Sequence, residues 1–206
     1  MRVLFVGNSF TAAHGMPERV RALAAEVGVS MDVEVVASGG ATLEKHAAGV
    51  RSGRGVGRWL GPRRARVDET WDAVVLQEQS QLGGLPRRHP QVAGSLAGAV
   101  ELAAAARAQG AVPVIFETWG RRAGDLTFPG WYPDYLVMQA RLTEGARRLA
   151  MTVGRPVLVA SVGSAFRKVF ERDARAFEGL FAADGAHPSA AGSALAAEVL
   201  AGVLCG

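Results

Sequence analysis

The sequence predicts an α/β fold, a three-layer α/β/α sandwich with a central parallel sheet of about five strands. Short apolar runs rich in β-branched residues recur along the chain, and stretches with helical patterning separate them. The runs are residues 3–6, 33–36, 73–76, 112–116 and 157–159. Apart from Glu34 in the second run, we interpret each as continuously apolar rather than alternating, which is typical of strands that helices cover on both faces. The alternation of strand and helix therefore favours a doubly wound parallel sheet.

Four segments carry the helix signals. They are residues 16–27, 91–109, 134–151 and 188–203. The first has Pro17 near its start and Gly28 just past its end, which is the usual placement of these residue types at helix termini. We expect Pro188 in the first turn of the last helix for the same reason.

Composition predicts one globular domain that spans residues 1–206. Apolar residues make up 49% of the chain and charged residues 20%, which suits a core that needs no disulfide bonds. The single cysteine, Cys205, excludes a disulfide framework and any metal site built of several cysteines. No signal-peptide pattern opens the chain and no apolar stretch approaches about 18 residues, so we expect a cytoplasmic protein without a membrane span.

The positive charge does not by itself indicate a nucleic-acid partner. The formal net charge is +4, and only Lys45 and Lys168 are lysines. Arginines and glycines are mixed in residues 51–66, which we interpret as a solvated, partly irregular surface segment. Nucleic-acid binding through this segment is the less favoured alternative.

Small and polar residues follow the carboxyl ends of four predicted strands. Ligand sites of open parallel sheets lie beyond these ends, so we expect the residues to share one rim of the sheet. They are Ser9 after the first strand, Gly39 and Gly40 after the second, Gln77, Glu78 and Gln79 at the third, and Glu117 and Trp119 after the fourth.

Three residues of the chain suit nucleophilic catalysis, which needs a hydroxyl, a base and a carboxylate that orients the base. Ser9 offers the hydroxyl, and His187 in the stretch DGAHPSAAG offers the base. Asp184 lies three residues before His187, so its carboxylate can reach one ring nitrogen while the other points outward. Each piece also has a purely structural interpretation, because Gly-Asn-Ser is common in turns and aspartate is a common helix cap.

An oxyanion needs hydrogen-bond donors, and two segments offer them. The backbone N–H groups of Gly39 and Gly40 can approach a ligand closely because glycine has no side chain. Gln77 and Gln79 each carry a side-chain amide that can donate.

Together these pieces resemble the SGNH hydrolases, also called GDSL-like esterases. That family carries Gly-Asp-Ser near its start, a glycine block after the second strand, Gly-x-Asn-Asp after the third and Asp-x-x-His-Pro near its end. The corresponding stretches here are GNS (7–9), SGGAT (38–42), QEQS (77–80) and DGAH with Pro188 (184–188), in the same order along the whole chain.

The resemblance implies a flavodoxin-like sandwich and ester hydrolysis through an acyl-enzyme, with no metal or organic cofactor. Ser9 would be the nucleophile, and Asp184 and His187 would complete the triad. Ser9, Gly40 and Gln79 would form the oxyanion hole.

Two departures from the family pattern affect these assignments. Asn8 stands where the family has aspartate, and we expect it to keep a similar hydrogen-bonding role. The third block lacks both the glycine and the asparagine, and Gln79 is longer than asparagine by one methylene. Gln77 therefore stays an alternative to Gln79 as the oxyanion donor.

The expected substrate is a small ester with a short acyl group, such as an O-acetyl group on carbohydrate. Residues 118–135 hold five aromatic side chains after the fourth strand, and they either wall a pocket or anchor their own loop. Lipid or thioester hydrolysis and a non-catalytic ligand-binding role are the alternatives.

Two further site types find little support. The first turn, GNSFTAAHG, lacks both G-x-G-x-x-G and a P-loop lysine, which disfavours nucleotide binding. No ligand-spaced cluster supports a metal site on His14, Asp184 and His187.

Overall fold

The structure is a computed structural model that describes residues 1–62 and 70–206. Within this part of the chain, five parallel strands form one sheet in the order β2-β1-β3-β4-β5. They are β1 (Arg2–Gly7), β2 (Asp32–Ala37), β3 (Ala73–Gln77), β4 (Val112–Phe116) and β5 (Leu158–Ala160). This is the strand order of flavodoxin-like sheets, in which the direction of winding reverses between β1 and β3.

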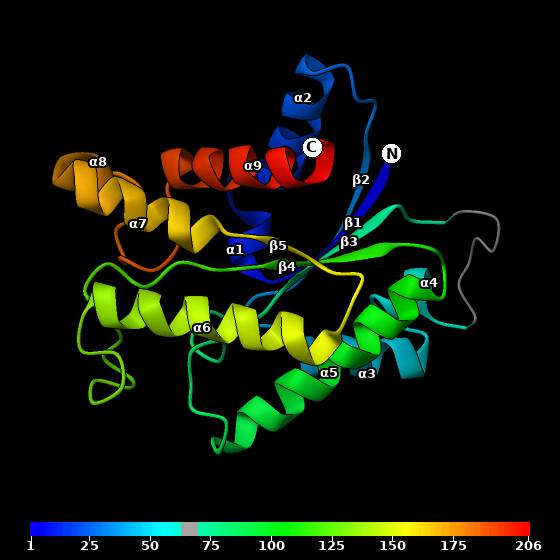
Figure 1. Cartoon of the computed structure of the whole chain (residues 1–206), viewed down its shortest axis with the longest axis horizontal. Coiled ribbons are helices and arrows are strands. Elements are labelled where there is room, and N and C mark those ends of the chain that lie inside the picture. Colours follow the sequence, from blue (N-terminus) through cyan, green and yellow to red (C-terminus); the bar gives the residue numbers. More distant parts are fainter. Residues whose placement is uncertain (63–69) are drawn as a thin grey trace.

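Helices cover both faces of this sheet, as Figure 1 shows. Those against one face are α2 (Met16–Glu26), α7 (Val162–Arg172) and α9 (Ala190–Cys205). Those against the other face are α3 (Leu43–Ser52), α4 (Gly57–Leu60), α5 (Pro90–Arg107) and α6 (Tyr135–Val153). The short helices α1 (Ser9–Ala12) and α8 (Ala174–Glu178) and the 3₁₀ turn η1 (Ala13–Gly15) lie in the connections. The predicted three-layer α/β/α fold is confirmed.

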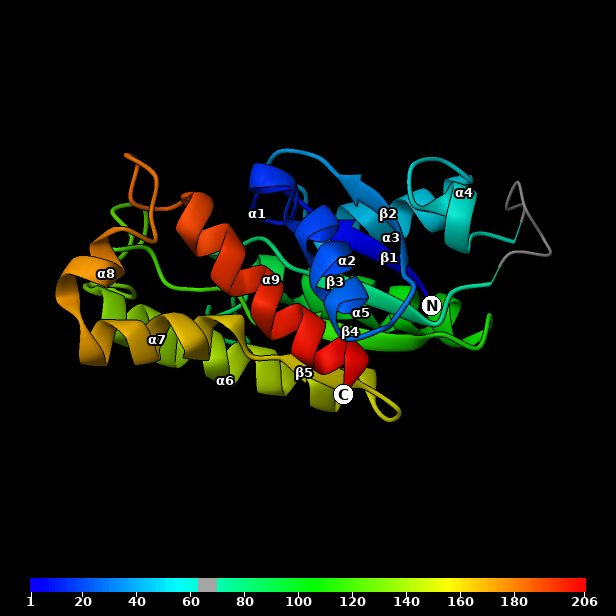
Figure 2. The same ribbon diagram turned by 90° about the horizontal axis from the view of Figure 1, so that it is seen from above.

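The first and last long helices of the chain are neighbours. Helices α2 and α9 lie side by side on one face of the sheet, as Figures 1 and 2 both show. This packing brings the C-terminal part of the chain to the layer that also carries the segment after β1.

Alternate residues of the central strands point into opposite layers. Val3 and Phe5 of β1 pack with α2 and α9, whereas Leu4 and Val6 pack with α3 and α5. All four side chains are fully buried, so these four successive positions of β1 must all be apolar. The continuous apolar runs in the sequence follow from this double burial.

The edge strand β2 departs from that expectation. None of its residues is fully buried, and Val35 is exposed. Because β2 lies at the edge of the sheet, the flanking helices cover it incompletely. The prediction of burial on both faces is therefore wrong for this strand.

The predicted helices are present, with ends shifted by a few residues. The main difference lies at α9, where Ser189 is the N-cap and its hydroxyl oxygen accepts the N–H groups of Ala191 and Gly192. Pro188 precedes the cap, so the expectation that it lies in the first turn is wrong. A serine N-cap satisfies two N–H groups that would otherwise lack partners at the helix start.

Helices occupy part of the arginine–glycine segment, residues 51–66. Arg51 lies in the last turn of α3, where it pairs with Glu101, and Arg58 lies in α4. The segment is thus more regular up to residue 62 than the sequence suggested. Arg63, Arg64 and Arg66 lie outside the described residues. Among the described residues, none of the helices is both long enough and apolar enough to cross a membrane.

Candidate active site

Three predicted site residues meet at the carboxyl end of the sheet. The Ser9 hydroxyl oxygen lies 2.9 Å from Nε2 of His187, although 178 positions separate the two residues. Nδ1 of the same ring lies 2.5 Å from Oδ2 of Asp184. A carboxylate only accepts hydrogen bonds, so Nδ1 carries a proton, and in the neutral ring the lone pair of Nε2 then faces the Ser9 hydroxyl.

The turn that holds Asp184 fixes the direction of its carboxylate. Oδ1 accepts the backbone N–H groups of Ala186 and His187, each at 2.9 Å, which leaves Oδ2 for the imidazole. Burial acts to raise the pKa of Asp184, but the hydrogen bonds from His187 and Ala186 outweigh it and lower the pKa to about 2. Asp184 is therefore ionised at neutral pH.

The nucleophile turn depends on Asn8. Its side-chain oxygen accepts the N–H of Phe10 at 3.1 Å and so caps α1, of which Ser9 is the first residue. As a first-turn residue, Ser9 has a backbone N–H without an intrahelical acceptor. The Asn8 cap thus leaves this N–H available to a ligand.

Close packing beneath the turn requires glycine at position 7. A β-carbon on Gly7 would lie 2.3 Å from the Thr11 hydroxyl and 2.6 Å from Oε1 of Gln77. His46 lies below the same turn, and its Nε2 donates to the Gly7 carbonyl at 2.8 Å. Burial lowers the pKa of His46, so the ring stays neutral near pH 7. Nothing in the sequence pointed to this role for His46.

The glycine block lies beside the nucleophile turn because β1 and β2 are paired in register. Gly7 is opposite Ala37 in the sheet, so both chains leave the rim together. The side-chain amide of Asn8 donates to the Ala41 carbonyl at 3.1 Å, which links the two segments directly. Gly40 is exposed and has a φ of +63°, a left-handed conformation that favours glycine.

The two glutamines of the third block have different surroundings. Gln77 is fully buried, and its Oε1 accepts the Asn8 N–H and the Thr11 hydroxyl, each at 2.9 Å. Its amide nitrogen donates to the carbonyl of Glu78. Gln77 therefore stabilises the nucleophile turn from the buried side.

Gln79 is only partly buried, and its side chain bends back into its own loop. Its Oε1 accepts the backbone N–H groups of Gln81 and Leu82, and its amide nitrogen donates to Oε1 of Gln81 at 2.7 Å. Among the contacts of the described residues, these use one of the two amide hydrogens of Gln79. An oxyanion role for Gln79 would depend on the second hydrogen or on a turn of the side chain.

An aromatic stack joins the segments that carry Ser9 and His187. The indole of Trp119 is fully buried between Phe10, at a centroid distance of 4.7 Å, and Phe166, at 4.5 Å. Its N–H donates to the Ala186 carbonyl at 3.1 Å. Trp119 therefore follows β4 as predicted, but it supports the site from inside the core.

The other aromatic residues after β4 mainly anchor their loop. Tyr132 and Tyr135 are buried, and the Tyr132 hydroxyl donates to the Gln81 carbonyl at 2.6 Å. The indole N–H of Trp131 donates to the Gly84 carbonyl, and the guanidinium of Arg141 covers its ring. Of the two interpretations of residues 118–135, the structure favours the self-anchored loop.

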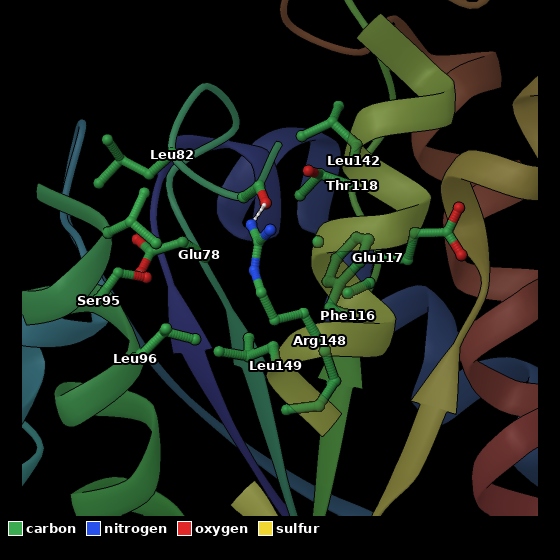
Figure 3. Close-up of a pocket in the computed structure, with 15 residues that line it drawn as sticks. Glu78, Leu82, Ser95, Leu96, Phe116, Glu117, Thr118, Leu142, Arg148 and Leu149 are labelled. Atoms are coloured by element: carbon green, nitrogen blue, oxygen red, sulfur yellow. Dashed lines mark hydrogen bonds between the residues drawn. The ribbon is translucent and has the colours of Figure 1, made fainter. Parts of the chain in front are cut away.

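A cavity of about 30 Å³ lies behind the rim between α5 and α6, and Figure 3 shows its lining. Glu78 and Ser95 stand at one wall, Arg148 reaches into it, and the Glu117 carboxylate points away from it. Such a volume suits a water molecule and excludes an ester substrate. The triad itself is open, since the side chains of His187 and Asp184 are 45% and 51% exposed.

No metal-binding arrangement accompanies the triad. Among residues 1–62 and 70–206, no group of three or more histidine, cysteine, aspartate or glutamate side chains is placed to hold an ion. His14 lies near the triad, but its Nε2 is 3.2 Å from the Pro188 carbonyl.

Comparison with known proteins places the chain in a family. No family model and no curated protein matches the sequence. A protein from Slackia heliotrinireducens described as a "putative SGNH hydrolase" shares 36% identity over 99% of this chain and 98% of its own, with a TM-score of 0.76. A DUF4886 family protein from Bacteroides uniformis shares 19% identity over 99% of this chain and 82% of its own, with a TM-score of 0.77. An acetylxylan esterase from Geobacillus stearothermophilus shares 15% identity over 97% of this chain and 91% of its own, with a TM-score of 0.67.

The last two likenesses show the fold alone, because their sequence identity is low. The first extends over nearly the full length of both chains at a much higher identity. With the strand order and the rim arrangement described above, it shows that the chain belongs to the SGNH hydrolases.

Proposed function

We propose that the chain is a serine esterase in which Ser9 is the nucleophile, His187 the general base and Asp184 the residue that orients the base. The observation that carries the proposal is the 2.9 Å contact between the Ser9 hydroxyl and Nε2 of His187. Solved variants of the acetylxylan esterase that are described as catalytic mutants replace a serine, an aspartate and a histidine. These are the residue types that meet at the rim here.

In the proposed reaction, Nε2 of His187 removes the Ser9 proton while the hydroxyl oxygen attacks the ester carbonyl. The oxyanion of the tetrahedral intermediate is held by the backbone N–H groups of Ser9 and Gly40 and by the side-chain amide of Gln79. The imidazolium then gives its proton to the departing alcohol, and an acyl-enzyme forms on Ser9. Water repeats the two steps on the acyl-enzyme and releases the acid.

The proposed substrate carries a short acyl group, such as an O-acetyl group on a carbohydrate. The half-exposed Asp184 and His187 and the exposed Gly40 favour a group presented from solvent. An open site of this kind offers little apolar surface to a long acyl chain, which needs an enclosed pocket. The likeness in fold to an acetylxylan esterase agrees with an acetyl substrate.

Hydrolysis of p-nitrophenyl esters of increasing acyl length, followed by acetylated xylo-oligosaccharides, tests the proposal. We expect turnover to be fastest for acetate and to fall with chain length. Ser9→Ala should lower kcat by at least about 10³-fold. Ser161→Ala, at an exposed serine after β5, is the matched control and should keep the wild-type rate. Binding of the acetylated sugar without any turnover would instead support the non-catalytic alternative.

A further inference from the structure

We propose that Glu78 is a positioning residue that holds the two segments carrying Gly40 and Gln79 at the spacing an oxyanion requires. This inference rests on the proposed function and adds to it a residue that never touches the substrate. Glu78 is buried, with 6% of its surface exposed, and the triad does not use it.

One carboxylate accepts hydrogen bonds from both segments. Its Oε1 accepts the backbone N–H of Gln79 at 2.6 Å and that of Leu43 at 3.2 Å. Leu43 is the first residue of α3 and lies three positions after Gly40. A single buried group thus ties the third block to the glycine block across the rim.

The second carboxylate oxygen fixes the group to the helix layer. Oε2 accepts the Ser95 hydroxyl from α5 and lies 3.4 Å from the Leu43 N–H. Figure 3 shows Glu78 and Ser95 adjacent at one wall of the small cavity. Because α5 packs directly against α3, this bond anchors the carboxylate to the scaffold that also positions Leu43.

Gln77 and Glu78, at the end of β3, both support segments of the proposed oxyanion site. Gln77 holds the nucleophile turn through Asn8 and Thr11, and Glu78 holds the start of α3 after the glycine block. Two adjacent side chains, on opposite sides of the strand end, therefore support different donors of one oxyanion site.

Glu117 provides a matched comparison on the neighbouring strand. It is also buried at a strand end, but its carboxylate accepts bonds from Gln139, Thr143 and Ser164 of α6 and α7. These partners carry none of the proposed oxyanion donors. A variant of Glu117 thus removes a buried carboxylate of the same kind without touching the glycine block.

The experiment compares four full-length variants, Glu78→Met, Glu78→Asp, Glu78→Gln and Glu117→Met, by p-nitrophenyl acetate kinetics and thermal unfolding. Glu78→Met removes both acceptors at similar volume, and Glu78→Asp keeps the charge but withdraws it from the N–H groups. We expect kcat to fall about 10–100-fold in both, with KM within about twofold, because oxyanion donors act on the transition state. Labelling of Ser9 by a phosphonate should slow by the same factor.

Rescue and control complete the test. Glu78→Gln keeps an oxygen for the two N–H groups and can donate to Ser95, so its kcat should stay within about threefold of wild type. Glu117→Met should lower the melting temperature and leave kcat nearly unchanged. If Glu78→Met misfolds, Glu78→Asp carries the comparison.

Wild-type kcat in folded Glu78→Met or Glu78→Asp would overturn the inference. An equal loss of kcat in Glu117→Met would also overturn it, since any buried carboxylate would then matter alike. Failure of the proposed function would look different. In that case the wild-type protein would show no ester hydrolysis that depends on Ser9. That last result would overturn both.

Discussion

The side-chain amide of Asn8 donates a hydrogen bond to the carbonyl of Ala41 across 3.1 Å, and so joins the turn that carries Ser9 to the segment that carries Gly40. The same side chain caps α1 through its oxygen. One residue therefore sets both the direction of the Ser9 N–H and its distance from the glycine block.

Replacing Asn8 with alanine should reduce both stability and turnover. Loss of the N-cap costs about 1 kcal/mol of unfolding free energy, and loss of the Ala41 link lets the two candidate donors drift apart. Asp134→Ala is the control, because Asp134 caps α6 in the same way through the Val137 N–H. Urea unfolding should show a loss in both variants, larger for the buried Asn8, and only Asn8→Ala should lose kcat. Equal kcat in both would contradict this role.

Gly40→Ala should impair catalysis through the backbone. A residue with a β-carbon at a φ of +63° costs about 1–2 kcal/mol, which favours a rearranged loop and a displaced N–H. Gly28→Ala imposes comparable strain at a φ of +80° after α2, away from the rim, with open space around the added carbon. Steady-state kinetics should show a lower kcat in the Gly40 variant alone. A loop that kept its activity with alanine at 40 would argue against the proposed donor.

Asp184→Asn should preserve the fold and lower kcat by about 10²–10⁴-fold, because an amide no longer holds the His187 tautomer that leaves Nε2 unprotonated. Asp173→Asn is a suitable control, since Asp173 caps α8 and makes no contact with the triad. The ratio of kcat/KM between the two variants measures the effect. A ratio near one would mean that Asp184 serves only as a turn residue.

Asp184 should also add a small, pH-dependent term to stability. Its pKa in the folded protein, about 2, lies below the value of about 4 in an unfolded chain. The stabilisation is therefore complete above about pH 4 and is lost as the pH falls toward 2. Urea unfolding of wild type and Asp184→Asn should show a difference that shrinks over that interval. The difference should stay small throughout, since the side chain is half exposed. A difference that does not change with pH would contradict the lowered pKa.

The fold could be predicted because burial on two faces leaves a strong trace in sequence. Runs such as residues 73–76 are apolar at every position since neighbouring side chains enter opposite layers. The residues at the rim could be predicted from the same apolar runs, because the carboxyl ends of parallel strands lie at one edge of the sheet. Proximity of Ser9 and His187 then required only that both segments lie beyond that rim.

Other features depend on tertiary contacts that no local pattern reveals. Strand alternation would place Gln77 and Gln79 on the same side, so it cannot tell them apart. They differ because β3 ends at Gln77 and Gln79 lies in the loop beyond it, and the sequence left that end point open. The roles of Glu78 and His46 depend on backbone groups of segments 35 and 39 positions away. Helices α3 and α7 were not predicted. The cap of α3 is a single threonine, and the N-cap Ser161 of α7 makes no side-chain hydrogen bond. The signal for α7 was nevertheless present, because Val162, Phe166 and Val169 recur at helical spacing.

The central claim is that Ser9 is the reactive nucleophile, and phosphonate labelling followed by peptide mass spectrometry tests it most directly. We predict a stoichiometric adduct on the peptide that contains Ser9, with loss of esterase activity in proportion and with much slower labelling in His187→Ala. An adduct on a different residue, or full activity after Ser9 is modified, would contradict the account.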